Sequence, residues 1–455
     1  MKLLKSILLP GVLLLVVLND GCRRSSSFPE LNARHSPDWV RNAVLYEISP
    51  RAFSMEGTFH GISRRLPELK KLGVTVLVLE PVYPIGELNR QGTFGNPYSV
   101  RDYYEVNEDL GTLEDFLALV KAAHADGFRI ILDLVAGYTS WDSRLLMEHP
   151  EWFQTNEEGS IISPKSDWVD VAALNYDRHE LRKYMIEMMK HWVRETAIDG
   201  FRCSDADLVP TDFWEIARHE LESIRPVCMI SESPVPALHL DAFDLSYSHE
   251  FGAALDSLDS GSGAASLLDS LLTNESLRYP LNSLFVRFDE DREKNSLQGA
   301  VQSRLGENAL RAGIVLTFTV PGIPLIFNGE ETGSTTRLSL HEKTQIDWGA
   351  KNKIGDLYVQ LCRLREKHPS LRQGEFKRLS NSADAKVFSF ARSAESDHVI
   401  VVVNMSKDPQ EFSLNPVPKL PNDFTDVTSQ ERVSSNESPW RFGLGGYGFK
   451  ILVSN

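Results

Sequence analysis

The chain has 455 residues, of which 42% are hydrophobic and 24% are charged, and its formal net charge is −15. These proportions are ordinary for a globular protein with a large core, and the length exceeds that of a typical single domain. The negative charge argues against nucleic acid as a partner, because phosphate binding requires a basic surface. The cysteines suit neither a disulfide framework nor a zinc site, and we expect those within predicted strands to be buried free thiols. The four cysteines of the chain are Cys22, Cys203, Cys228 and Cys362, of which Cys203 and Cys228 fall in predicted strands.

The first 22 residues are predicted to be a signal peptide. Two lysines precede an apolar run over 7–18, which is too short to span a bilayer. Gly21 and Cys22 then resemble the processing site of a bacterial lipoprotein, in which the cysteine carries the lipid. Secretion without a lipid is the alternative, because the two residues before Gly21 are polar. We therefore expect an exported protein, periplasmic or extracellular, whose membrane contact is a lipid anchor on Cys22.

Residues 23–40 are expected to form a flexible linker. From 41 to 369, helical patterns alternate with short apolar strands that end in polar residues, which predicts a (β/α)8 TIM barrel. From 370 to 455 the hydrophobic period changes to two, which predicts a small antiparallel β-domain. The strands of the barrel are expected at about 44–48, 74–79, 128–132, from 200 onward, 227–231, 243–247, 283–288 and 323–327.

Residues 200–205 (Gly-Phe-Arg-Cys-Ser-Asp) are predicted to be a buried strand that ends in a polar loop. In a TIM barrel the loops after the strands carry the chemistry. Side chains alternate along a strand, so if Arg202 faces the site then Ser204 does too. Asp205 is then expected to face the helical layer, unless a bulge bends the end of the strand.

The same stretch resembles the nucleophile segment of the alpha-amylase family of glycoside hydrolases, in which Gly-Phe-Arg is followed by any residue and then an aspartate. The resemblance covers about residues 40–455 and implies a TIM barrel with an inserted subdomain at 134–178 and a C-terminal β-domain. It also implies α-linked glucans or oligosaccharides as the substrate class. Other stretches resemble further motifs of the family in the right order: 86–90, 97–104, 133–142, 230–232 and 321–327.

The family's reaction needs one carboxylate that forms a glycosyl ester and a second that protonates the leaving oxygen. The resemblance makes Glu232 the acid and Arg202 the residue that orients the nucleophile, but Ser204 occupies the place of the nucleophilic aspartate. Attack by serine would give an alkyl glycoside, far harder to hydrolyse than an ester, and no base is evident beside Ser204. We therefore expect hydrolysis to be absent or weak. The alternative is a rearranged site in which Asp205 is the nucleophile.

Two other motifs depart from the family. Gly137 and Tyr138 replace the Asn-His pair after the third strand, so neither the family's calcium site nor any other cofactor is expected. We match the Asn-His-Asp after the seventh strand to Asp291, Arg292 and Glu293, which keeps a third carboxylate at Glu293. A permanent cation at Arg292, near Glu232, would favour the carboxylate over the acid form. A salt bridge between Arg292 and Glu293 is the structural alternative.

Aromatic side chains close to the predicted strand ends are candidate sugar platforms, since aromatic faces stack on apolar sugar faces. Tyr138 is also a candidate to fill the vacated sugar pocket itself. The residues predicted to bind substrate are Tyr98, Asp102, Tyr138, Trp141, Arg202 and Arg292.

Three functions remain open from the sequence. An active hydrolase or transglycosylase with a rearranged site predicts turnover. A glucan-binding protein that has lost chemistry predicts saccharide binding without turnover, and an accessory protein that uses the barrel as a scaffold predicts neither. The fold alone does not choose among them, but the loss of the nucleophile favours a catalytically impaired protein of the alpha-amylase type.

Overall fold

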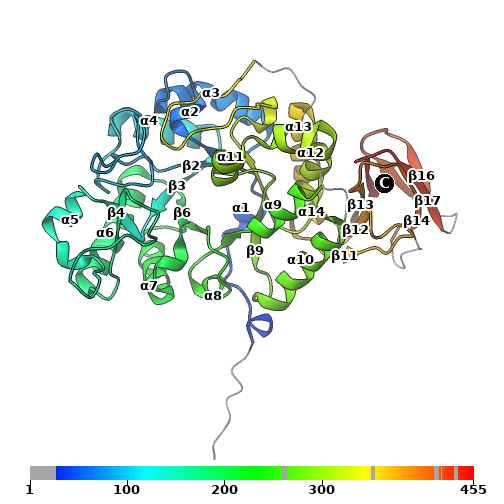
Figure 1. The fold of residues 1–455 in the computed structure, drawn as a ribbon. Coiled ribbons are helices and arrows are strands. Elements are labelled where there is room, and N and C mark those ends of the chain that lie inside the picture. The colour runs from blue at the N-terminus through cyan, green and yellow to red at the C-terminus, as the bar shows by residue number, and fades with distance from the viewer. Residues whose placement is uncertain are drawn as a thin grey trace, which may run out of the picture.

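The computed structural model describes residues 27–258, 264–349, 354–414, 420–421, 423–434 and 439–454. The predicted signal peptide and Cys22 lie outside these residues. Figure 1 shows a body of helices around a central set of strands, with the C-terminal strands at one side, next to α12 and α14. Among the described residues, no helix combines the length and the apolar character needed to cross a membrane.

In the described chain, eight parallel strands close into a barrel in the order β1-β10-β9-β8-β7-β6-β3-β2, which confirms the predicted fold class. Each strand lies within a few residues of its predicted position. Their bounds are β1 Leu45–Ile48, β2 Val76–Leu79, β3 Arg129–Val135, β6 Gly200–Ser204, β7 Cys228–Ser231, β8 Leu245–Tyr247, β9 Leu284–Arg287 and β10 Ile323–Phe327.

Strand β2 shows why the barrel strands are apolar at every position. Val76 and Val78 point into the barrel, whereas Leu77 and Leu79 pack against the surrounding helices. A strand that is buried on both faces needs an apolar side chain at each residue. At the start of β6 the backbone of Gly200 has φ of 150°, and a Cβ there would lie 1.8 Å from the carbonyl oxygen of Cys228. Only glycine fits this close approach of β6 to β7.

The helices that cover the barrel begin and end at recognisable signals. The side chain of Thr58 accepts a hydrogen bond from the Gly61 amide at the start of α3, and Gly73, with φ of 99°, ends that helix. The larger helices are α3 Phe59–Leu72, α4 Leu113–Ala125, α6 His179–Thr196, α7 Thr211–Glu222, α9 His249–Asp256, α10 Ala264–Arg278, α12 Val301–Thr319 and α13 Ile354–Lys367. The shorter ones are α1 Asp38–Arg41, α2 Pro50–Phe53, α8 Leu238–Asp241, α11 Arg292–Gln298 and α14 Pro369–Gln373.

The segment between β3 and β6 has more regular structure than its sequence indicates. Strands β4 (Tyr138–Ser140) and β5 (Val171–Ala173) pair antiparallel, and a helix, α5, covers Arg144–Glu148. Five residues are too few to produce a helical period, which is why no helix is predicted there. The segment lies over the C-terminal end of the barrel and contributes side chains to the site described below.

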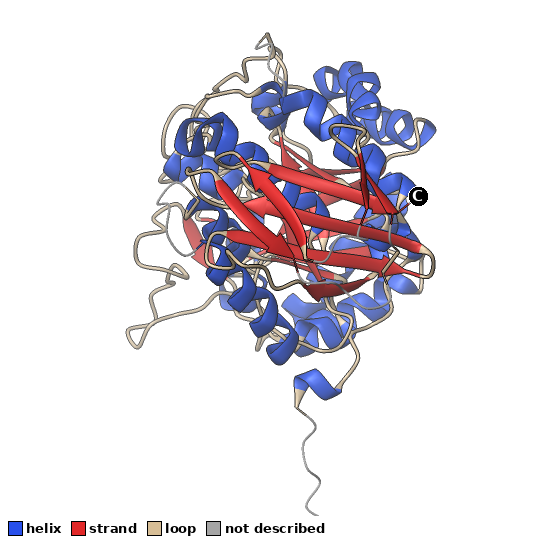
Figure 2. Ribbon diagram, turned by 90° about the vertical axis from the view of Figure 1, so that its right-hand side faces the viewer, coloured by secondary structure: helices blue, strands red, loops and turns tan. Residues whose placement is uncertain are grey.

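After α14 the chain forms two antiparallel sheets, seen face-on in Figure 2. Within the described residues, six strands form one sheet in the order β11-β12-β13-β18-β15-β16, and β14 pairs with β17. Val401 and Val403 of β13 pack toward the barrel, whereas Ile400 and Val402 pack toward the smaller sheet. The bounds are β11 Glu375–Arg378, β12 Val387–Ala394, β13 Asp397–Asn404, β14 Gln410–Leu414, β15 Asp423–Asp426, β16 Arg432–Ser434, β17 Trp440–Leu444 and β18 Phe449–Ser454.

The cysteines of the described chain are Cys203, Cys228 and Cys362, and all three are free and buried, which confirms the expectation for the two strand residues Cys203 and Cys228. Burial raises the pKa of the Cys362 thiol to about 12. We therefore expect them to pack as small apolar side chains.

Candidate active site

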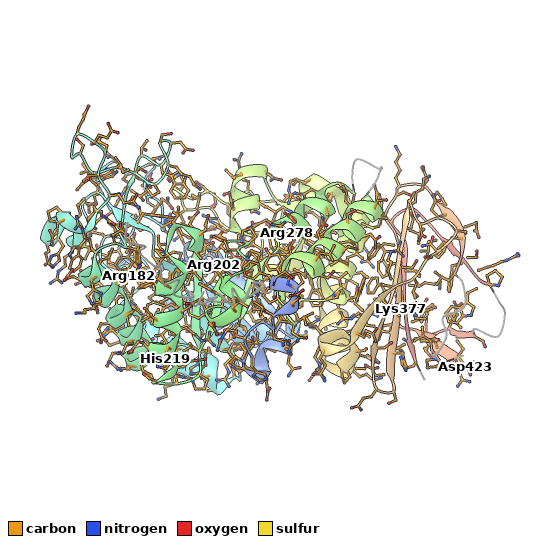
Figure 3. The ribbon with its side chains drawn as sticks, turned by 90° about the horizontal axis from the view of Figure 1, so that it is seen from below. Arg182, Arg202, His219, Arg278, Lys377 and Asp423 are labelled. Atoms are coloured by element: carbon orange, nitrogen blue, oxygen red, sulfur yellow. The ribbon has the colours of Figure 1, made fainter. Side chains whose placement is uncertain are left out.

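A buried arginine joins the ends of three neighbouring strands. Asp133 on β3 lies in register with Arg202 on β6, and Glu232 follows β7 directly. The Arg202 side chain is 3% exposed and donates hydrogen bonds to Asp133 and, at 2.6 Å from Nη2 to Oε1, to Glu232. Figure 3 shows Arg202 within the barrel, far from the C-terminal sheet that carries Lys377. Arg202 is thus the shared cation of two carboxylates at the C-terminal end of the barrel.

Ser204 belongs to this buried network. Its Oγ donates to Oδ1 of Asp133 at 2.8 Å and accepts from Nη1 of Arg202 at 2.9 Å. The expectation that no base lies beside Ser204 is therefore wrong, because the Asp133 carboxylate accepts a hydrogen bond from the Ser204 hydroxyl. Burial, opposed by Arg202, raises the pKa of Asp133 to about 6. A carboxylate with that pKa is still a weak base toward a serine hydroxyl.

Asp205 does not follow the alternation of β6. Its backbone lies in the left-handed region, with φ of 45° and ψ of 45°, so the chain turns as the strand ends. Its carboxylate accepts a hydrogen bond from Tyr138 Oη at 3.0 Å and lies 3.7 Å from Nζ of Lys165, and its amide donates to Oε2 of Glu232 at 3.3 Å. The simple expectation that Asp205 faces the helical layer is wrong, and the bend weighed as its alternative is present.

Three carboxylates therefore share one region above the barrel. Burial, and next the charge of Glu232, raises the pKa of Asp205 and of Glu293. The side chains of Asp205 and Glu232 are 26% and 18% exposed, so both reach solvent. His249, the first residue of α9, lies between Glu232 and Asp291. Its Nε2 is 3.1 Å from the carbonyl oxygen of Glu232, and its Nδ1 is 3.6 Å from Asp291.

Arg292 does not lie where the sequence predicts. Its Nε is 3.4 Å from Glu80, and its Nη2 donates to the carbonyl oxygen of Ser339 at 2.8 Å. Within the described chain it forms no ion pair with Glu293 or Glu232. Adjacent residues of a helix point in different directions, and Arg292 and Glu293 are the first two residues of α11. The cation beside Glu232 is Arg202 instead.

The predicted aromatic platforms are divided between the two sides of the site. Tyr98 Oη donates to Asp133 at 3.2 Å, so its ring lies beside the Arg202 network. Tyr138 is 4% exposed and packs edge-to-face on Trp168, whose ring lies 4.0 Å from Nζ of Lys165. Tyr138 and Lys165, both from the inserted segment, contact Asp205, and the Trp168 ring packs on both of them.

Two of the predicted substrate-binding residues make contacts away from this network. Trp141 Nε1 donates to the carbonyl oxygen of Val169 at 3.0 Å, which orients its ring within the inserted segment. Asp102 accepts from the amide of Tyr104 at 2.8 Å and lies 3.7 Å from Arg144. Both side chains are therefore held by contacts outside the Arg202 network.

Known proteins resemble this chain over most of its length. The family model for the alpha amylase catalytic domain matches residues 25–170, and the one for the maltogenic amylase C-terminal domain matches residues 376–451. The chain belongs to the alpha-amylase family. Alpha-amylase MalA of Haloarcula japonica is 26% identical over 434 residues, which cover 90% of this chain and 62% of that protein. A cyclomaltodextrinase of a Bacillus species is 24% identical over 420 residues, which cover 82% of this chain and 74% of that protein.

Solved structures of the alpha-amylase family share the same fold. A maltogenic alpha-amylase, AmyB of Thermotoga neapolitana, superposes with a TM-score of 0.84 at 29% identity, covering 91% of this chain and 99% of that one. An alpha-amylase of Lactobacillus plantarum superposes with a TM-score of 0.82 at 27% identity and the same coverage. The likeness therefore extends over both the barrel and the C-terminal domain.

Sequence reasoning missed three residues of the site in this alpha-amylase family member. Asp133 and His249 each belong to a strand end or its following loop, which is the signal that identifies functional positions in a TIM barrel. Glu47 is an acid within the otherwise apolar strand β1, and such a residue signals a buried polar partner. Tyr247 Oη donates to it at 3.2 Å.

Buried carboxyl groups also make the stability depend on pH. Burial, partly offset by Arg202, raises the pKa of Glu47 to about 8, and burial raises the pKa of Asp289 and Glu290 to about 7. These folded-state values lie above the ordinary values near 4 of an unfolded chain. Their contribution to stability is therefore complete below about pH 4 and is lost as the pH rises through about 7 to 8.

We expect the melting temperature to fall between about pH 5 and about pH 8, and the Glu47→Gln variant to show a smaller fall. The neutral amide removes the cost of ionising a buried group, so at the higher pH the variant should have a higher melting temperature than the wild type. The expected difference is about 2–4 °C for each kcal/mol of ionisation cost removed. The control is Glu87→Gln, because that side chain is 67% exposed. Equal pH dependence in Glu47→Gln and the wild type would contradict the assignment.

Proposed function

We propose that this alpha-amylase family member binds α-linked glucans at the C-terminal end of its barrel and hydrolyses them weakly or not at all. The observation that carries the proposal is the hydrogen bonding of Ser204. Its hydroxyl lies between Asp133 and Arg202, where the resemblance expects the nucleophilic carboxylate. Position 204 therefore offers the anomeric carbon an alcohol oxygen in place of a carboxylate.

The consequence follows from the stability of the intermediate. A carboxylate nucleophile gives an acyl ester that water cleaves with help from the second carboxyl group. A serine would give an ordinary glycoside, so a second displacement would be as slow as the reaction that the site has to catalyse. In addition, both oxygens of Glu232 accept hydrogen bonds, from Arg202 and from the Asp205 amide. These donors occupy one lone pair of each oxygen and fix the orientation of the carboxyl group.

Saccharide binding does not need the nucleophile. The partly exposed carboxylates of Asp205 and Glu232 are acceptors for sugar hydroxyls, and Tyr98 beside them offers an aromatic face. The relatives' names, alpha-amylase and cyclomaltodextrinase, support an α-glucan or maltooligosaccharide as the ligand.

A second candidate function is hydrolysis with Asp205 as the nucleophile. The left-handed turn at Asp205 favours it, because the turn brings this carboxylate to the same side as Glu232. Against it, Tyr138 holds Oδ2 of Asp205 and Lys165 lies 3.7 Å from Oδ1, so neither carboxylate oxygen is free of a contact.

Maltoheptaose distinguishes these functions, with binding measured by calorimetry and turnover by release of reducing sugar. We expect saturable binding by the purified protein with turnover at background, and weaker binding by Asp205→Asn and Glu232→Gln. The control is Asp212→Asn, an acid of α7 that is 61% exposed and pairs with Arg182. Turnover that both site variants abolish would overturn the proposal in favour of the second candidate. Neither binding nor turnover would indicate a scaffold protein.

We also propose that the protein is exported and anchored by a lipid on Cys22. Support comes from the charged, apolar and small-residue pattern of residues 1–22. Mass spectrometry of the protein isolated from cell membranes should find a lipidated Cys22 at the amino terminus. A mature chain that begins elsewhere and carries no lipid would refute the anchor.

A further inference from the structure

A cavity lies between the barrel and the C-terminal domain. Its volume is about 600 Å³, and its walls include the start of β9, the residues just before β10, and parts of α10, α14, β11 and β12. The Arg202 network lies at the opposite, C-terminal ends of the strands. In Figure 3, Arg278 at the end of α10 and Lys377 of β11 mark the two sides of this junction. The cavity is therefore separate from the candidate active site.

The wall of this cavity is strongly basic in a chain whose net charge is −15. Five arginines and two acids line it, and each acid is paired with a different one of these arginines. Arg287 donates to both oxygens of Glu275, at 2.7 and 2.6 Å, and Nε of Arg378 lies 3.3 Å from Asp269. The other three are Arg41, Arg372 and Arg392. Of the residues that the structure describes, no carboxylate lies within 4 Å of their guanidinium groups.

Arg392 is the most deeply buried of these three arginines. It is 2% exposed, its two Nη atoms donate to the carbonyl oxygens of Thr319 and Gly374, and its Nε is buried without a hydrogen-bond partner in the described chain. A further arginine, Arg365, is 1% exposed, and its partners are also backbone carbonyls. Buried cations are normally paired, because removing a charge from water is costly.

The arginines also act on one another. Burial, and then the charges of Arg392 and Arg372, lowers the pKa of Arg365 to about 9. Burial, and then the charge of Arg287, lowers the pKa of Arg392 to about 10. An anion among these side chains would relieve both the burial cost and the mutual repulsion.

We propose that this cavity binds a phosphate oxyanion, either inorganic phosphate or the phosphate group of a small phosphorylated sugar, through Arg41, Arg372 and Arg392. Guanidinium groups match phosphate with paired hydrogen bonds, and a tetrahedral oxyanion has enough oxygens for three of them, whereas a carboxylate has two. Arg41 belongs to α1 beside the barrel, and Arg372 and Arg392 belong to α14 and β12. A bound oxyanion therefore links the barrel to the C-terminal domain and stabilises their junction.

The test measures binding by calorimetry and the melting temperature, with sodium phosphate compared to sodium chloride at equal ionic strength. The key variant is Arg41→Gln/Arg372→Gln, because both side chains are only partly buried and form no ion pair in the described chain. The matched control is Arg432→Gln, an exposed arginine on β16. We expect phosphate to raise the melting temperature of the wild type and the control, and to bind the double variant at least about tenfold more weakly.

A parallel titration with glucose 1-phosphate distinguishes the two sources of the phosphate group. Tighter binding than inorganic phosphate, lost in the double variant, identifies a phosphorylated sugar, and equal binding identifies the free anion. Arg372→Lys keeps the positive charge but loses the paired N–H donors of the guanidinium group, so it should bind phosphate with intermediate affinity. This conservative variant keeps the test valid if the double variant does not fold. Binding that is the same in the wild type and the folded double variant, or no binding by the wild type, would overturn the proposal. Maltoheptaose binding reports separately on the candidate active site.

Discussion

The Ser204→Asp variant is expected to release reducing sugar from maltoheptaose at least about a hundredfold faster than the wild type, because removal of a nucleophile commonly costs far more than this. The new carboxylate would lie beside Nη1 of Arg202, which already contacts Oγ of Ser204 at 2.9 Å. It would form an acyl ester that Glu232 can help water to cleave. A second buried acid next to Asp133 should lower the melting temperature by a few degrees. The loss should stay this small because the charge of Arg202 partly compensates both acids.

The control for this prediction is Ser204→Asn, which has the shape of aspartate but cannot form the ester. It should stay at background while the aspartate variant gains activity. Adding Glu232→Gln to Ser204→Asp should remove most of the gained activity, because the leaving oxygen then lacks its proton donor. A folded Ser204→Asp variant that binds maltoheptaose without turnover would contradict the prediction and would direct attention to Tyr138 and Asp205.

The Arg202→Met variant is expected to lose about 3–5 kcal/mol of unfolding free energy, because it leaves a buried carboxylate without its cation. The Arg202 side chain is 3% exposed and Asp133 is 2% exposed, and Arg202 is the ion-pair partner of both Asp133 and Glu232. Burial already raises the pKa of Asp133 to about 6 in spite of the arginine. Urea unfolding followed by fluorescence measures the loss.

The matched control is Arg144→Met, on α5, whose side chain is 62% exposed and pairs with Glu148. Because water screens that pair, its stability should hardly change. Adding Asp133→Asn to Arg202→Met should recover part of the loss, since the neutral amide removes the unpaired charge. A loss in Arg202→Met no larger than in Arg144→Met would refute the central role of this arginine.

The barrel and its strand positions could be predicted from the sequence because they depend on local patterns. β2 is an unbroken apolar run, and only a strand that is buried on both faces needs one. The C-terminal strands alternate with a period of two, and each face meets a different core. Short elements such as α5 escaped prediction, because five residues do not complete two helical turns.

The partners of the site residues could not be predicted in the same way. Ser204 bonds to Asp133, 71 positions away, because β3 and β6 are neighbours in the barrel. Arg292 pairs with Glu80, although Glu293 is its neighbour in sequence. The bend at Asp205 is a left-handed backbone conformation that aspartate can adopt but that the local sequence does not require, and Tyr138 contacts the side chain there.

The sequence by itself therefore determined the fold and placed a serine at position 204, because hydrophobic period and residue identity are properties of the chain. Only the tertiary structure decided which charges meet: Arg202 with Asp133 and Glu232 at one end of the barrel, and the unpaired arginines at its junction with the C-terminal domain. The physical reason is that electrostatic interactions depend on distance and burial in space, and neither can be read from separation along the chain.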